Sequence, residues 1–142
     1  MKAIVSKVLK EPADTMGIVE LHINEKGIDI ILNASMNNSI KASDKPREVE
    51  LCFYSEEYCI DEKLSDVKGS IKKIDKGKIE DTYCEVKGRI KRIDKFNDEI
   101  YVDVKCLDKI FQIVCYEKDD YSLKEGDYLK AICWTEIVEG KS

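Results

Sequence analysis

Residues 83–116 read YCEVKGRIKRIDKFNDEIYVDVKCLDKIFQIVCY, and this stretch contains the clearest pattern in the chain. Apolar and polar residues alternate along residues 100–106, which is typical of a strand with one buried face. Polar residues at 97–98 and a tight connection at 107–109 separate this strand from its two neighbours. Short polar connections of this kind join antiparallel strands. We therefore predict three successive strands that form an antiparallel ribbon.

The first of these strands contains one of two copies of a basic ten-residue phrase. The copies are VKGSIKKIDK at 67–76 and VKGRIKRIDK at 86–95, and they agree at eight of ten positions. In the second copy, Ile93 falls out of the alternation that Val86 and Ile90 establish around Gly88. A glycine followed by a shift of phase is typical of a bent or bulged strand. We predict such a strand for the second copy.

The first copy leaves two interpretations open. Its apolar residues continue a series that begins at Ile60 and Leu64 with steps of three and four, which suits a helix. Valine, isoleucine and a central glycine favour a strand instead, because all three are poor helix formers. We favour the strand and leave the helix open for residues 57–76.

Further strands are expected on both sides of this region. Residues 17–33 alternate in the manner of a β-hairpin, with a turn at 24–27 in which Gly27 would take a positive φ. Residues 33–39 are polar and are expected to form a loop. A strand is expected after Pro46, and residues 128–135 form the last one. The two halves therefore show a similar order of strands, which raises the possibility of a duplicated architecture.

Residues 83–138 resemble an OB-fold barrel. The resemblance is carried by VKGRIKRID as a glycine-bent first strand, FNDEIYVDVKC as turn and second strand, IFQIVCY as the third, and SLKEGDYLKAICWTEI as connection and late strand. The usual fifth strand is missing unless the N-terminal half supplies it, and the helix after the third strand is reduced to DDYSLKEG. The resemblance implies a binding barrel for single-stranded nucleic acids, oligosaccharides or proteins.

The predicted fold class is thus mostly β. We expect an N-terminal antiparallel β-subdomain at residues 1–78 and an OB-like antiparallel barrel at residues 79–142, with at most one or two short helices. The N-terminus lacks the apolar run of an export signal, and the chain has no apolar stretch long enough to span a membrane. These features predict a soluble, cytoplasmic protein without membrane contact.

The six cysteines are expected to be reduced. They are irregularly spaced, most of them alternate with apolar neighbours, and no export signal accompanies them. A zinc site is not expected, because the chain has no CxxC pair and only one histidine, His22. No nucleotide fingerprint or Gly-rich phosphate loop is present, so we expect no metal and no cofactor.

Composition and motifs do not favour an enzyme. His22 has no adjacent nucleophile motif, and the paired acids lie in polar connections where surface charge is usual. A glycosidase pair of carboxylates is not excluded by sequence alone. We expect a protein without catalytic residues.

The best functional signal is a basic face with aromatic neighbours. Bases stack on aromatic rings while cations follow phosphates, so this mixture suits a single-stranded nucleic acid. The candidate binding residues are Lys87, Arg89, Lys91, Tyr101, Lys105, Tyr116 and Tyr128. Net charge opposes this reading, because residues 85–138 contain ten basic and twelve acidic side chains.

We therefore expect a binding or interaction module whose partner is another protein, in the manner of an adaptor, an inhibitor or a toxin-neutralising protein. Mixed surface charge with exposed tyrosine suits such an interface. The alternative is a protein that binds single-stranded DNA or RNA. Self-association through strand edges is a third possibility, although the lysines of the repeat would discourage it.

Overall fold

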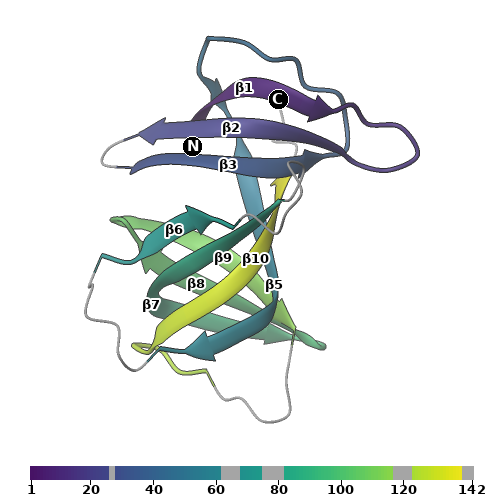
Figure 1. Cartoon of the computed structure of the whole chain (residues 1–142). Coiled ribbons are helices and arrows are strands. Elements are labelled where there is room, and N and C mark those ends of the chain that lie inside the picture. The colour runs from purple at the N-terminus through teal and green to yellow at the C-terminus, as the bar shows by residue number, and fades with distance from the viewer. Residues whose placement is uncertain (26–27, 62–67, 75–81, 117–122, 139–142) are drawn as a thin grey trace. The chain divides into compact units, whose positions relative to one another are not determined.

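The computed structural model describes residues 1–25, 28–61, 68–74, 82–116 and 123–138, and every regular element in this part of the chain is a strand. The prediction of a mostly β protein is confirmed. The strands are β1 (Lys2–Lys10), β2 (Gly17–Glu25), β3 (Ile28–Met36), β4 (Arg47–Glu48), β5 (Glu50–Ile60), β6 (Ser70–Lys73), β7 (Tyr83–Phe96), β8 (Glu99–Cys106), β9 (Lys109–Tyr116) and β10 (Tyr128–Val138) (Figure 1). The described residues include no helix that could cross a membrane.

The chain forms two compact units, each assembled from separate segments. The first, here called the sheet unit, comprises residues 1–52, 72–84 and 134–142. The second, here called the barrel unit, comprises residues 53–71 and 85–133. The predicted boundary between residues 78 and 79 lies outside the described residues, so the division at that point stays a prediction.

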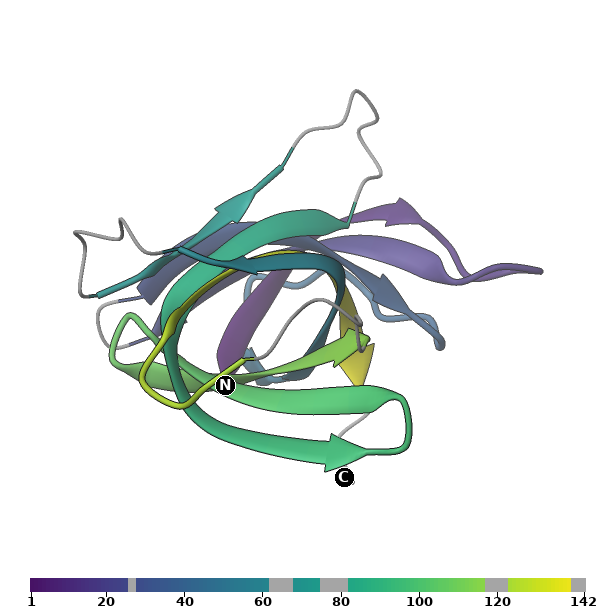
Figure 2. The same cartoon turned by 90° about the horizontal axis from the view of Figure 1, so that it is seen from below.

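Five strands of the barrel unit close into a ring. Their order is β5, β9, β8, β7 and β10, and a pairing of β10 with β5 completes the circle (Figure 2). The closed ring is compatible with an OB-like small barrel. The ring is not antiparallel throughout, because β5 runs parallel to β9 with Phe53 opposite Ile113. The N-terminal half therefore supplies one of the barrel's strands.

Alternation along the strands fills the barrel with apolar side chains. Every second residue of β8 is buried, and the same holds for β10 within the barrel unit. Phe53 and Phe111 meet edge to face inside, with ring centroids 5.9 Å apart. The fully or nearly fully buried residues of the barrel unit include Val86, Ile90, Ile100, Val102, Val104, Cys106, Ile113, Cys115, Leu129, Ala131 and Cys133.

The predicted irregularity in the second copy of the repeat is confirmed. The register of β7 against β8 shifts between Ile90 and Arg92, so Lys91 is an extra residue in β7. Ile90 pairs with Val104, and Ile93 pairs with Val102. The bulge thus allows two isoleucines three positions apart to lie opposite two buried valines.

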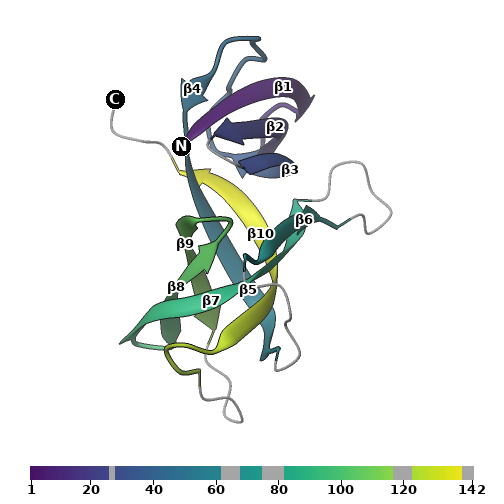
Figure 3. The same cartoon turned by 90° about the vertical axis from the view of Figure 1, so that its left-hand side faces the viewer.

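The first copy of the repeat contains a strand at Ser70–Lys73, whereas residues 62–67 and 75–76 lie outside the described part of the chain. β6 lies beside β7 (Figure 3). The two equivalent glycines meet there, because a Cβ on Gly69 would lie 2.2 Å from the carbonyl oxygen of Lys87 and 3.2 Å from the Cα of Gly88. Gly69 also has a φ of 74°, which favours glycine. The close contact with Lys87 and the positive φ therefore both disfavour a side chain at this position.

The sheet unit is built on the predicted hairpin of β2 and β3. The two strands pair without interruption from Gly17 opposite Met36 to Glu25 opposite Ile28, while the predicted turn residues Lys26 and Gly27 lie outside the described part. The expected loop at residues 33–39 is wrong in its first half. β3 continues to Met36, because the ladder to β2 continues and Ala34 and Met36 are buried.

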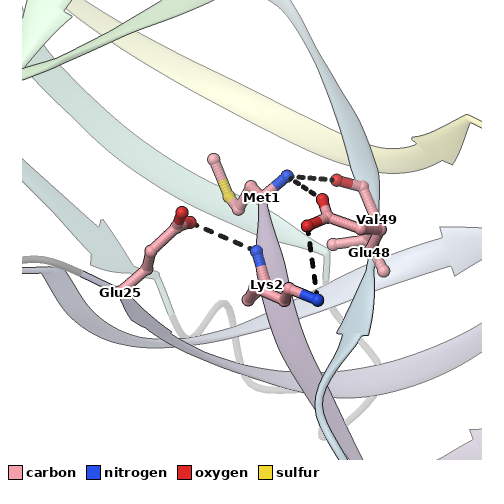
Figure 4. A network of polar contacts seen from close by, with 5 residues as sticks. All are labelled: Met1, Lys2, Glu25, Glu48 and Val49. Carbon is pink, nitrogen blue, oxygen red and sulfur yellow. Dashed lines mark hydrogen bonds and ion pairs between the residues drawn. The ribbon is translucent and has the colours of Figure 1, made fainter.

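A polar network links the start of β1 to β4 and β2 (Figure 4). The Met1 ammonium group donates to a carboxylate oxygen of Glu48 at 2.8 Å, and Lys2 Nζ lies 3.6 Å from the other oxygen. The hydrogen bond from the ammonium group lowers the pKa of Glu48. The amide N–H of Lys2 donates to the Glu25 carboxylate at 3.2 Å.

All six cysteines are reduced, as predicted. Four of them are buried, namely Cys84, Cys106, Cys115 and Cys133, and Cys52 and Cys59 are half-buried. Burial raises the pKa of Cys84 to about 11, and its Sγ lies 3.6 Å from the Thr135 hydroxyl. These thiols behave as small apolar side chains of the core.

Gly69→Ala should destabilise the fold more than Gly126→Ala. Both glycines have positive φ, so both changes carry the same kind of backbone strain, but nothing lies within 4 Å of a Cβ on Gly126. The difference reflects the clash with Lys87 and should amount to about 1–3 kcal/mol of unfolding free energy. Denaturant titration of the two variants measures it, and equal losses would show that the glycines do not meet.

Thiol reactivity should follow burial. In the native protein, a thiol reagent such as DTNB should modify Cys52 and Cys59 first and the four buried cysteines only after unfolding. Prompt reaction of five or more thiols in the folded protein would contradict the barrel packing.

Stability should also depend on Cys84 at alkaline pH. Its folded-state pKa of about 11 lies above the ordinary thiol pKa of 9.0, so the stabilising contribution is whole below pH 9 and is lost as the pH rises through about 11. The shift corresponds to about 2–3 kcal/mol. Urea titrations at several pH values should show a loss in the wild type that is smaller in Cys84→Ala, and identical losses would argue against a buried thiol.

Candidate functional site

The outer sides of β7, β8 and β9 form one continuous surface, here called the outer face. Residues directly opposite in an antiparallel ladder project to the same side. Arg89, Lys105 and Ile110 form one row across the three strands, and Phe96, Glu99 and Tyr116 form another. These two rows are separated by six residues of β8, or roughly 20 Å of extended strand.

A basic pocket of about 220 Å³ lies at the first of these rows. Its lining, which defines the basic pocket, consists of Lys68, Arg89, Lys91, Lys105 and Asp108. Three predicted residues, Arg89, Lys91 and Lys105, are therefore brought together. Lys91 reaches this site because it is the extra residue of the β7 bulge.

Lys68 comes from the first copy of the repeat, where it is the equivalent of Lys87. The amide N–H of Leu107 donates to the carbonyl oxygen of Lys68 at 2.6 Å, which ties this segment to the turn between β8 and β9. Leu107 and Asp108 both have positive φ, with values of 52° and 63°. A two-residue turn of this type matches the twist of the strands and places Asp108 beside the lysines.

Tyr128 belongs to the same neighbourhood. The Arg89 guanidinium lies 5.9 Å from the centroid of the Tyr128 ring, within the range of a cation–π contact. Tyr128 is half-buried at the start of β10. The ring therefore holds the Arg89 head near the pocket without neutralising its charge.

Lys87 does not line the basic pocket. Its ammonium lies 3.6 Å from the carboxylate of Glu85, which is also 3.9 Å from the ammonium of Lys130. Lys87 is therefore engaged in a small charge cluster of its own. The sequence pattern placed it in the binding set because it alternates with Arg89 and Lys91.

The other two predicted tyrosines lie toward the far end of the outer face. Tyr101 is opposite Asp94 on one side and Val114 on the other, and its hydroxyl donates to the Glu99 carboxylate at 2.6 Å. Tyr116 is 36% exposed, and its carbonyl accepts a hydrogen bond from the Tyr58 hydroxyl at 2.7 Å. The predicted set is thus split between a basic end and an aromatic end.

Three residues of the outer face and its basic pocket were not predicted from the sequence. Phe96 and Ile110 are exposed apolar side chains, with 67% and 63% of their surface accessible. Lys68 was missed because its copy of the repeat could not be assigned to a strand beside β7. The sequence contained a signal for Phe96, because the shift of phase at Ile93 also moves Phe96 from the inner to the outer side of the strand.

The single histidine pairs with one carboxylate of the neighbouring strand. His22 lies on the outer side of β2, and its Nε2 is 2.5 Å from a carboxylate oxygen of Asp29. Among the residues that the structure describes, no group of three or more His, Cys, Asp or Glu side chains could hold a metal ion.

Comparison with family models, curated proteins and solved structures gave no significant match to this chain.

Proposed function

We propose that this protein is a non-enzymatic binding module that docks a protein partner on the outer face. The observation that carries the proposal is that most exposed large apolar side chains lie on this one face, Phe96 and Tyr116 at one end and Ile110 in the basic row at the other. Of the five large hydrophobic residues that are exposed in the described part of the chain, Phe96, Ile110 and Tyr116 belong to this surface. Exposed apolar and aromatic groups with a polar surround are typical of protein interfaces.

We also propose that the closed barrel is OB-like. On this reading β7, β8 and β9 are its first three strands, β10 is the late strand, and β5 takes the place of the missing fifth strand. The ring order and the β10–β7 pairing support this correspondence. The outer face then consists of the first three strands of a barrel type that commonly serves binding.

The charges around the apolar residues favour specific binding over non-specific hydrophobic association. Glu99 lies directly between Phe96 and Tyr116 in the ladder, and Arg92 pairs with Asp94 at 3.0 Å. Such charges form the polar rim of an interface and select against wrong partners.

Single substitutions should identify the partner and its docking site together. Affinity capture with quantitative mass spectrometry compares the wild type with Phe96→Ser, Tyr116→Ser and the control Ile31→Ser, which removes an exposed apolar side chain (50% accessible) from β3. A true partner should bind the wild type and the control equally and should bind the two outer-face variants about tenfold more weakly. Any partner lost equally from all three variants does not use this face.

A second candidate function is binding of single-stranded DNA or RNA, favoured by the basic pocket and the Arg89–Tyr128 contact. Cations and a stacked ring lie together there, as such ligands require. Fluorescence anisotropy with labelled oligonucleotides tests it. Four pocket cations predict a slope of about −3 in log affinity against log salt, and Lys105→Gln should reduce it by roughly one cation's share. Absence of binding at low salt would eliminate this candidate.

A further inference from the structure

The geometry points to a built anion site in the basic pocket, and we infer that it binds a phosphate-type oxyanion. This inference goes beyond the proposed function, because the site stands whether the partner is a protein or a nucleic acid. Three separate segments of the barrel unit supply its cations: Lys68 before β6, Arg89 and Lys91 on β7, and Lys105 on β8. Together with Asp108 they give the lining a net charge of +3.

The three pocket cations on β7 and β8 form no ion pair with another residue in the described part of the chain. The ion pairs found there do not include Arg89, Lys91 or Lys105. The carboxylates of Glu48, Glu85 and Asp94 are instead paired with other cations. All three side chains are exposed. A concave site with uncompensated charge of one sign concentrates the opposite ion.

The placement of Arg89 directly opposite Lys105 is unfavourable without a ligand. Like charges at directly opposed positions of an antiparallel pair repel each other and weaken the sheet. The two residues are held there by the ladder, whose inner positions on either side are buried. An anion between them would convert this repulsion into attraction, so occupancy should stabilise the fold.

The lining also selects the class of anion. Arginine presents a planar fork of donors that matches the oxygens of a phosphate, and lysine adds point charges around it. The pocket volume of about 220 Å³ is below the range of about 300–1,000 Å³ that is usual for drug-sized ligands. A compact, multiply charged group such as a phosphoryl group therefore fits better than a larger organic acid.

Thermal unfolding with inorganic phosphate tests the site. At about 20 mM phosphate the wild type should gain about 3 °C or more in Tm over sodium chloride of equal ionic strength. The chloride control is needed because salt alone screens the repulsion between Arg89 and Lys105. An equal gain in chloride would overturn the site.

The variant Lys105→Gln distinguishes stabilisation by a bound anion from general screening of charge repulsion by salt. In low salt without phosphate its Tm should equal or exceed that of the wild type, because the opposed charges are gone, yet its phosphate response should be lost. Lys91→Gln, at the exposed bulge, should also lose the response and serves if Lys105→Gln fails to fold. Lys7→Gln makes the same charge change in the sheet unit and should respond like the wild type. Responses of equal size in all variants would contradict the proposal.

Two further ligand pairs identify the source of the phosphoryl group. An oligonucleotide with a 5′-phosphate is compared with its 5′-hydroxyl form, and a phosphoserine peptide is compared with its serine form. A tenfold preference within one pair, lost in Lys105→Gln, assigns the group to that class of ligand. A phosphate response without either preference supports free phosphate as the ligand. These readouts do not involve Phe96 or Tyr116, so failure of the anion site and failure of the proposed docking function are distinguishable.

Discussion

The approach of two glycine backbones underlies the basic pocket of the barrel unit. Gly69 and Gly88 occupy the same position in the two copies of the repeat, and a Cβ on either would overlap neighbouring backbone. Because Gly69 has no side chain, the segment before β6 can lie against Lys87 and Gly88 of β7, and the turn after β8 can bind the carbonyl of Lys68. The missing side chain of Gly88 allows β8 to approach instead, since a Cβ there would lie 2.5 Å from the carbonyl oxygen of Lys105. The repeat therefore acts as a packing device that brings a lysine of the first copy to the basic residues of the second.

The bulge in β7 complements that contact. The extra residue Lys91 restores the apolar alternation, so that Ile90 and Ile93 both lie opposite valines of the core. The same residue places a third cation beside Arg89 and Lys105. A single insertion thus satisfies the barrel interior and concentrates charge outside it, at the cost of like-charge repulsion across the ladder.

Much of the fold followed from local patterns, whereas the site depended on pairing between distant segments. Alternation predicted β2, β3 and β8, the tight connection at 107–109 predicted β9 as the next strand, and the phase of Ile93 predicted the bulge. The alternation within a single strand cannot reveal the parallel pairing of β5 with β9 or the placement of Lys68 beside the basic residues of β7 and β8. Lys87 was placed with the basic residues by alternation, but its neighbour Glu85 holds it elsewhere. The extension of β3 beyond Asn33 to Met36 shows the same limit, since the neighbouring strand overrides the turn preference of polar residues.

The two copies of the repeat lie side by side at their glycines, and NMR tests this arrangement most directly. In isotopically labelled protein, nuclear Overhauser effects should link the Hα protons of Gly69 to those of Gly88, because the Cβ direction of Gly69 leads to within 3.2 Å of the Gly88 Cα. An assigned spectrum in which Gly69 has no cross-peaks to Lys87 or Gly88 would contradict the account.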